Sequence, residues 1–99
     1  MKPESYQLSK YEHHDIFEFT SVGRRGNIRK LIIFRETSRQ LSYEFIFGDY
    51  DGYSGKIDTK TVSDNGDFKV VMATVVKAVQ FFLVSHSDRT VVFRGSTES

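Results

Sequence analysis

The sequence predicts an α+β domain in which one long helix packs on one face of a mainly antiparallel sheet of four to five strands. Three observations predict it. Alternating apolar residues mark strands in the first half, apolar residues at spacings of three and four mark a helix in the second half, and one more β-rich run follows that helix. The expected order is β-β-β-(β)-α-β. A chain of 99 residues suits a single domain spanning residues 1–99.

The first elements are an arm and a hairpin. Residues 1–14 mix tyrosines and a leucine with polar neighbours, which permits an extended arm or a short edge strand. Residues 16–22 form the first clear strand, because Phe17 and Phe19 alternate with polar residues. A hairpin loop is expected at 23–27, where two glycines flank a charged tip.

The next strands complete the predicted sheet. Residues 28–35 are rich in β-branched and aromatic side chains, as in a central strand, and 36–39 form a polar turn. The clearest alternation comes next, at Leu41, Tyr43, Phe45 and Phe47. Glycines and aspartates at 48–55 predict a turn, and a short strand is expected at 56–62.

A helix is expected after an acidic, glycine-containing segment. Asp64 or Asn65 could cap it, and Asp67 would then lie in its positive first turn. One apolar stripe follows at helical spacing and is interpreted as core: Phe68, Val71, Met72, Val75, Val79, Phe82 and Leu83. Residues 86–88 end the helix, and 90–94 form the last strand.

Composition excludes several classes of protein. Fourteen Lys and Arg against thirteen Asp and Glu leave a charge of +1, so no global field points to nucleic acid or an anionic membrane. The absence of cysteine excludes disulfides and thiolate chemistry. The polar start is not a signal peptide, and no apolar stretch is expected to reach the roughly 18 residues of a membrane span. We therefore expect a cytoplasmic domain with no membrane partner.

Several motifs in consistent order carry a family resemblance from Phe19 onward. They are residues 45–51 (FIFGDYD), 55–58 (GKID), 62–67 (VSDNGD), 72–75 (MATV) and 95–97 (GST). The chain resembles a family of small bacterial proteins of unknown function. The resemblance implies the fold and brings no activity or cofactor.

The resemblance also implies a departure at the end of the chain. Family members continue past the Gly-Ser-Thr with an arginine-rich, tyrosine-containing helix, whereas this sequence ends at Ser99. A strand, that tripeptide and a helix would place backbone N–H groups at a helix N-terminus, which is an anion site. Arg94, Ser96 and Thr97 are the candidate contacts, and the sequence lacks the helix that would complete them.

A basic segment is the candidate nucleic-acid contact. Residues 21–40 hold six basic residues against one acidic residue. Those at the predicted hairpin are Arg24, Arg25, Arg29 and Lys30. They could contact phosphates, with Tyr43 or Tyr50 as a stacking surface. The interpretation that we favour is a solvated strand face with a charged tip.

No metal and no cofactor are expected. His13, His14 and Asp15 could ligate an ion with His86, but adjacent side chains of an extended segment point to opposite faces, which favours exposed loop histidines. An EF-hand pattern counted from Asp49 fails at Tyr53, Ser54 and Lys60. A hairpin turn with Asx hydrogen bonds is favoured there.

The sequence thus predicts a non-enzymatic protein-interaction or binding module, with no catalytic residue assigned. A protein partner or a second copy would dock on a sheet edge or an open face. One alternative is a nucleic-acid-binding module that uses the arginine-rich hairpin at 23–35. A second is an enzyme or binder for a phosphorylated small molecule at 95–97.

Overall fold

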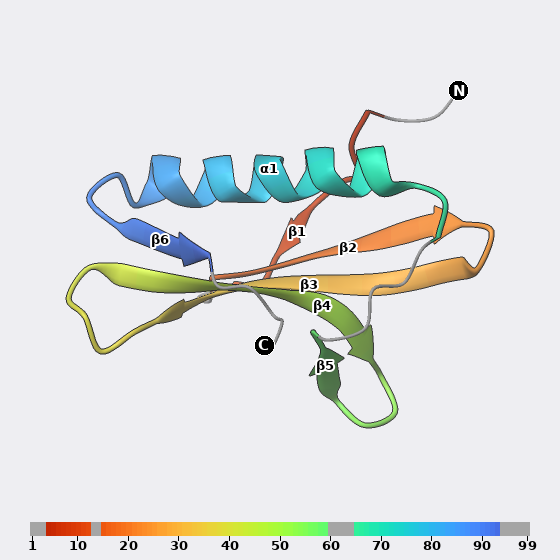
Figure 1. The fold of residues 1–99 in the computed structure, drawn as a ribbon, viewed down its shortest axis with the longest axis horizontal. Helices are drawn as coiled ribbons and strands as arrows, with labels where there is room; N and C mark the ends of the chain where they lie inside the picture. The colour runs from red at the N-terminus through yellow and green to blue at the C-terminus, as the bar shows by residue number, and fades with distance from the viewer. Residues whose placement is uncertain (1–3, 13–14, 60–64, 94–99) are drawn as a thin grey trace.

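The computed structural model describes residues 4–12, 15–59 and 65–93, which form a six-stranded sheet covered on one face by one helix (Figure 1). The elements in chain order are β1 (Ser9–Lys10), β2 (Ile16–Gly23), β3 (Gly26–Glu36), β4 (Ser42–Asp51), β5 (Lys56–Asp58), α1 (Phe68–Ser85) and β6 (Thr90–Phe93). The predicted α+β class and order of elements are confirmed, and the N-terminal segment contributes a short edge strand.

The sheet is antiparallel except at one pair. Strands β1 to β5 lie in sequence order, so β3 is central, as its composition predicts. Strand β4 pairs with β5 near its end, where Tyr50 faces Ile57, and in parallel with β6 near its start, where Tyr43 faces Val91. Because β3 occupies the other edge of β4, β5 and β6 share the remaining edge.

The core lies between α1 and the sheet. Its buried members are Phe17, Phe19, Ile32, Phe34, Val71, Val75, Ala78 and Phe82. The ring of Phe82 stacks on that of Phe34 with centroids 4.2 Å apart, and the two side chains are 1% and 3% exposed. Each such side chain contributes roughly 1.5–3 kcal/mol by leaving water, so this aromatic contact fixes α1 on the sheet.

The helix is rotated relative to the prediction from its apolar stripe. Phe68, Met72 and Leu83 were expected in the core but are 72%, 41% and 38% exposed. Val70, Thr74 and Ala78 are buried in their place. With about 100° per residue, the buried face is turned by roughly 80° from the predicted one. A single sheet covers only one side of α1, and more apolar residues are present than that side can hold.

The prediction for 41–55 is corrected at both ends of β4. The strand begins after Leu41, which lies in the preceding turn with φ at +60°. It continues through Asp51, so part of the expected turn is strand. Gly48 explains why that part looked like a turn. A Cβ there would lie 2.4 Å from the carbonyl oxygen of Asp58, so glycine is needed for β5 to pair closely.

The predicted helix cap is also wrong. Asp67 is itself the N-cap and makes no capping hydrogen bond, because its carboxylate is bonded elsewhere. The side chain of Asn65 binds the β2–β3 hairpin. Asp64 lies outside the described residues.

Candidate functional site

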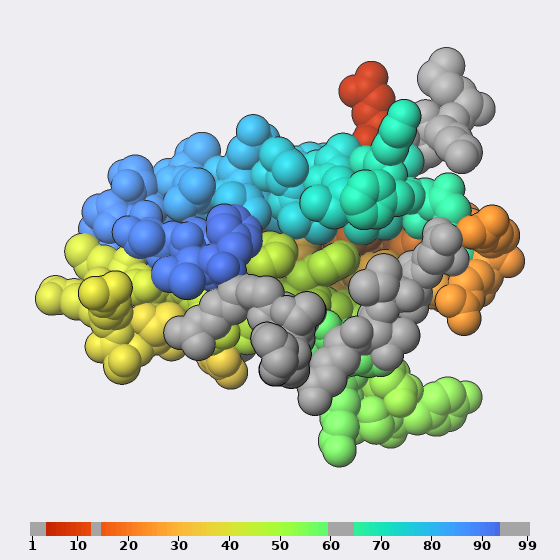
Figure 2. All heavy atoms as spheres, viewed as in Figure 1, coloured from red at the N-terminus to blue at the C-terminus, as the bar shows by residue number. Residues whose placement is uncertain are grey.

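The outer face of α1 is the main exposed apolar surface of the described part of the chain. Phe68, Met72, Val76 and Leu83 are between 38% and 72% exposed. Their helix carries only two charged residues, Lys69 and Lys77. Figure 2 shows α1 as an upper layer of the molecule, with the N-terminal segment standing above one end of it, where Tyr6 and Ser5 bond to Thr74 and Lys77. Exposed apolar surface of this kind marks sites where a protein or a membrane binds.

The spacing of these residues is that of a coiled-coil seam. Met72, Val76, Val79 and Leu83 are separated by four, three and four residues, which is the a/d pattern of two heptads. We call these four residues the outer stripe. Val79 is half-buried and also packs against the core, so the stripe begins at the edge of the sheet-facing side.

By length and hydropathy alone, α1 meets the criterion for a membrane-spanning helix. It has 18 residues with a mean hydropathy of 1.7, and 28% of them are buried. The expectation that no apolar stretch approaches this length is therefore wrong. Core helices of soluble proteins meet the same criterion, and this helix carries the core contacts of the sheet.

Strand β6 borders the same surface. Within the described ranges, its only strand partner is β4. Phe93 at its end is 60% exposed, and its ring centroid lies 5.0 Å from that of Phe45. An edge strand offers backbone groups to an added strand, so β6 extends the apolar surface with hydrogen-bonding capacity.

A buried polar cluster of Tyr6, Ser21, Asn65 and Asp67 fixes the N-terminal end of α1. The hydroxyls of Ser21 and Tyr6 both donate to Asp67 Oδ2 at 2.5 Å. The amide nitrogen of Asn65 donates to Ser21 Oγ at 3.0 Å. Ser21, Asn65 and Asp67 are at most 8% exposed. Satisfied buried polar groups of this kind specify one arrangement of neighbouring elements.

The electrostatics of the cluster favour an ionised Asp67. Burial alone would raise the pKa of this carboxyl, but hydrogen bonds from Ser21 and Tyr6 and the charge of Lys30 outweigh it and lower the pKa below its ordinary value. Burial and the bond to Asp67 raise the pKa of the Tyr6 phenol. Because Asp67 accepts hydrogen bonds from both hydroxyls, its carboxylate has a structural role and is not free to act as a base.

Asn65 joins the same cluster to the β2–β3 hairpin. Its Oδ1 accepts from the backbone N–H of Arg25 at 2.6 Å, and its carbonyl oxygen accepts from that of Arg24 at 3.2 Å. A Cβ on Gly23 would lie 1.9 Å from the carbonyl oxygen of Asn65. Glycine therefore permits the hairpin to approach, and the segment before α1 serves the fold.

The structure separates the basic residues predicted to bind phosphate. Gly23 pairs with Gly26, so the hairpin turn consists of Arg24 and Arg25 alone, shorter than the predicted loop. Arg29 and Lys30 are neighbours in β3 and lie on opposite faces of the sheet. The four residues therefore do not share one face.

Two of these cations are engaged in ion pairs. Arg29 pairs with Glu18 at 2.7 Å and lies over the ring of Tyr50, 4.6 Å from its centroid. The side chain of Lys30 is 6% exposed and pairs with Asp49 at 2.6 Å. The Arg29 contact lowers the pKa of Glu18 against an opposing effect of burial. These pairs stabilise the sheet and leave little of either charge for a phosphate.

Other predicted sites have different outcomes. Arg94, Ser96 and Thr97, with the tripeptide at 95–97, lie outside the described residues, as do His13 and His14. Asp15 and His86 are brought together, with Oδ1 and Nε2 3.8 Å apart. Among the described residues, no group of three His, Cys, Asp or Glu could hold a metal ion.

The turn after β4 has the predicted Asx hydrogen bonds. Asp51 accepts from the backbone N–H of Tyr53 at 2.9 Å and from the Ser54 hydroxyl at 3.0 Å. These bonds lower the pKa of the Asp51 carboxyl. The turn is thus explained without calcium.

Sequence reasoning missed the buried polar cluster and the outer stripe. The segment at 65–67 drew attention as a helix start, but its partners Tyr6 and Ser21 are distant in sequence. The heptad spacing within the longer apolar stripe was a usable signal for a second contact face.

Comparison with known proteins agrees with the resemblance seen in the sequence. The model of a family of unknown function, DUF6934, matches residues 2–99, which extends the resemblance beyond the part that begins at Phe19. No curated protein and no solved structure matches the chain. The match brings no activity, substrate or partner with it. The chain belongs to the family of unknown function DUF6934.

Proposed function

We propose that this chain is a non-enzymatic protein-interaction module that binds a second copy of itself through the outer stripe of α1. The observation that carries the proposal is the heptad spacing of Met72, Val76, Val79 and Leu83 on a face that the sheet leaves exposed. Helices with this spacing pack side by side, each side chain entering a hole on the facing helix. A second α1 offers that complementary surface by symmetry.

The charges of α1 favour an antiparallel pair. A parallel pair would set Lys69 beside Lys69 of the second copy, and α1 contains no acidic residue to offset them. An antiparallel pair brings each Lys69 near the C-terminal end of the facing helix, whose last turn carries no basic residue. The partial negative charge of that end attracts a cation. A net charge of +1 also leaves little repulsion between copies.

The antiparallel arrangement has a definite register. Pairing all four residues of the outer stripe sets Met72 against Leu83 of the second copy and Val76 against Val79 of the second copy. The two-fold axis then passes between Val76 and Val79, and Phe68 lies beyond the seam at each end.

No comparable observation supports the alternatives. Nucleic-acid binding would draw on Arg24, Arg25, Arg29 and Lys30, of which Lys30 is buried in an ion pair and Arg29 is paired on the opposite face. A site for a phosphorylated small molecule would use Arg94, Ser96 and Thr97, for which the described residues provide no geometry. Both remain predictions from the sequence.

The test compares two glutamate substitutions on α1 by analytical ultracentrifugation from micromolar to millimolar concentration. Val76→Glu places a charge in the middle of the outer stripe, whereas Val84→Glu places the same charge at an 81% exposed position outside it. The unchanged chain and Val84→Glu should form dimers that dissociate on dilution, and Val76→Glu should stay monomeric. Circular dichroism confirms that both variants are folded.

Two results would overturn the proposal. The first is an unchanged chain that is monomeric throughout the series. The second is equal loss of dimer in both variants, which would indicate a contact elsewhere. A co-sedimentation assay with vesicles containing anionic lipid is run in parallel. A monomer that binds those vesicles through Val76 would assign the outer stripe to a membrane surface instead.

A further inference from the structure

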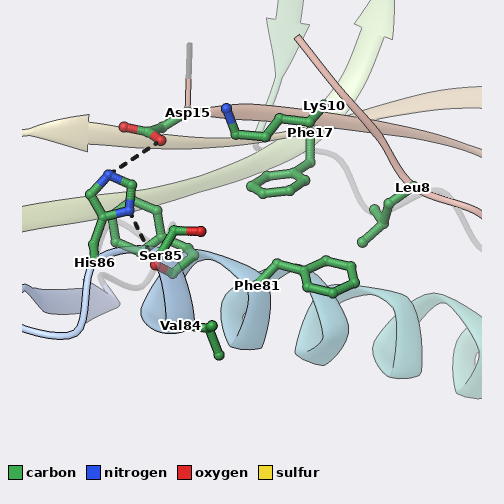
Figure 3. Close-up of a pocket in the computed structure, with 9 residues that line it drawn as sticks. Leu8, Lys10, Asp15, Phe17, Phe81, Val84, Ser85 and His86 are labelled. Carbon is green, nitrogen blue, oxygen red and sulfur yellow. Dashed lines mark hydrogen bonds and ion pairs between the residues drawn. The ribbon is translucent and has the colours of Figure 1, made fainter. Parts of the chain in front are cut away.

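A separate cavity lies on the other flank of α1, between its C-terminal end and the start of β2. Its volume is about 280 Å³, the size of a small ligand. Five apolar residues line it: Leu8, Phe17, Phe81, Phe82 and Val84. Lys10, Asp15, Ser85 and His86 supply polar groups at its rim (Figure 3).

The ring of His86 has a defined orientation at that rim. Its Nδ1 lies 3.2 Å from the carbonyl oxygen of Phe82, which can only accept a hydrogen bond. Nδ1 therefore carries a proton, and in the neutral ring Nε2 is an acceptor. The ring also stacks on Phe82 with centroids 4.5 Å apart, which holds it in this position.

Two hydrogen-bond acceptors consequently face each other beside an apolar cavity. His86 Nε2 and Asp15 Oδ1 are 3.8 Å apart, too far for a direct hydrogen bond (Figure 3). A carboxylate and a neutral imidazole nitrogen at this separation suit a shared donor that carries positive charge. Protonation of His86 would supply one internally, and a bound ammonium group would supply one from outside.

We propose that this cavity binds a small hydrophobic primary amine. Its ammonium group donates to Asp15 Oδ1 and His86 Nε2, and its hydrocarbon portion lies between Phe17 and Phe81. Charge-assisted bonds of this kind are stronger than neutral ones. Lys10 adds a positive charge at the same rim, which could attract an anionic ligand. The test must therefore compare a cationic probe with an anionic one.

The test measures the binding of three phenylalkyl probes of similar size by chemical-shift titration of the isotope-labelled chain. They are 2-phenylethylamine, 2-phenylethanol and 3-phenylpropanoate. The amine should bind at least tenfold more tightly than the alcohol and the carboxylate, with shifts centred on Asp15, Phe81 and His86.

Two variants assign the contact. Asp15→Asn keeps the backbone carbonyl that accepts from Phe34 N–H at 3.0 Å, so the strand start is retained while the charge is lost. It should weaken amine binding at least tenfold. Asp88→Asn makes the same change at an exposed carboxylate outside the cavity lining and should leave amine binding unchanged.

Equal binding of all three probes would overturn the proposal, because the cavity would then select only for apolar bulk. So would the absence of amine binding at millimolar concentration. The probe series on the unchanged chain decides the question even where a variant is poorly folded. Val76→Glu should bind the amine as the unchanged chain does, so failure of self-association and failure of amine binding are distinguishable.

Discussion

The two faces of α1 are both apolar, but the sheet covers only one of them. On the inner face, Val71, Val75 and Phe82 are at most 9% exposed and pack on aromatic residues of the sheet. On the outer face, Met72 and Val76 are 41% and 51% exposed. Hydrophobicity alone therefore does not identify the core side of a helix. The contacts of α1 with the strands, together with the buried polar cluster at its N-terminal end, determine which face of the helix lies against the sheet.

The largest expected loss of stability comes from a substitution on the inner face of α1. Phe82→Ala removes a ring that stacks on Phe34 and leaves a cavity, so the free energy of unfolding should fall by about 3–5 kcal/mol. Met72→Ala on the outer face should cost less than about 1 kcal/mol in the monomer. Urea unfolding of both variants at low protein concentration measures the difference. Equal losses would contradict the assignment of the two faces.

The second effect concerns the contact that sets the position of α1 relative to the hairpin. Gly23→Ala would place a Cβ against the carbonyl oxygen of Asn65 and separate the hairpin from the segment before α1, at a cost of about 3 kcal/mol. Gly26→Ala is the matched control in the same turn. It has φ at +92° and no atom within 4 Å of the added Cβ, so we expect a cost of about 1–2 kcal/mol from backbone strain alone. Thermal unfolding that ranks Gly26→Ala as the more damaging change would contradict this account.

A smaller effect comes from the charge of Asp67. Its pKa in the folded chain is below the ordinary value, so its contribution to stability is present above the unfolded-state pKa and is lost as the pH falls through the folded-state pKa. Asp67→Asn should lower the free energy of unfolding by about 1–2 kcal/mol at neutral pH and by progressively less in acid. Urea unfolding between neutral and strongly acidic pH measures this.

Asp88→Asn is the control for that series. Asp88 pairs with Arg89 at the surface, and its side chain is 68% exposed. Its substitution should leave the pH dependence of unfolding unchanged. Parallel curves for the unchanged chain and Asp67→Asn would show that Asp67 is not the group whose ionisation stabilises the fold.

The smallest expected effect on stability comes from a substitution on the outer face of α1. Val76→Glu should change the free energy of unfolding of the monomer by no more than about 0.5 kcal/mol, because the side chain is already half in water. Chemical unfolding at submicromolar concentration checks this. A large loss in the monomer would mean that Val76 belongs to the core, and its effect on association would then have another cause.

The local patterns predicted most of the fold. Alternation predicts β2 and β4, β-branched and aromatic composition predicts β3, and the spacing of three and four predicts α1, because these signals depend only on neighbouring residues. The rotation of α1 was not predictable, since its apolar residues extend over more than one face. Contacts between distant segments were also missed, such as Lys30 with Asp49 and Asp67 with Ser21, because they depend on register and packing.

The candidate binding surfaces were likewise predictable only in part from the sequence. A partner was expected on a sheet edge or an open face, whereas the exposed apolar face of α1 became visible only with the burial of each side chain. The neighbourhood of Asp15 and His86 was considered for a metal, and the structure brings the two together at the rim of an apolar cavity. The arginine-rich hairpin was interpreted as one basic patch, because the sequence alone does not show that Arg29 and Lys30 form ion pairs with acidic residues on neighbouring strands.

The most direct measurement of the central proposal is disulfide cross-linking with cysteines introduced into α1, because the chain has none of its own. In the antiparallel register, Met72→Cys lies opposite position 83 of the second copy. The two positions 72 are then separated by ~16 Å along the helix axis, beyond the reach of a disulfide. A mixture of Met72→Cys and Leu83→Cys should therefore form a mixed dimer on mild oxidation, faster than either variant alone and faster than Val84→Cys. Rapid dimerisation of Met72→Cys alone would contradict the antiparallel arrangement, and a mixture no faster than Val84→Cys would contradict the use of the outer stripe as an interface.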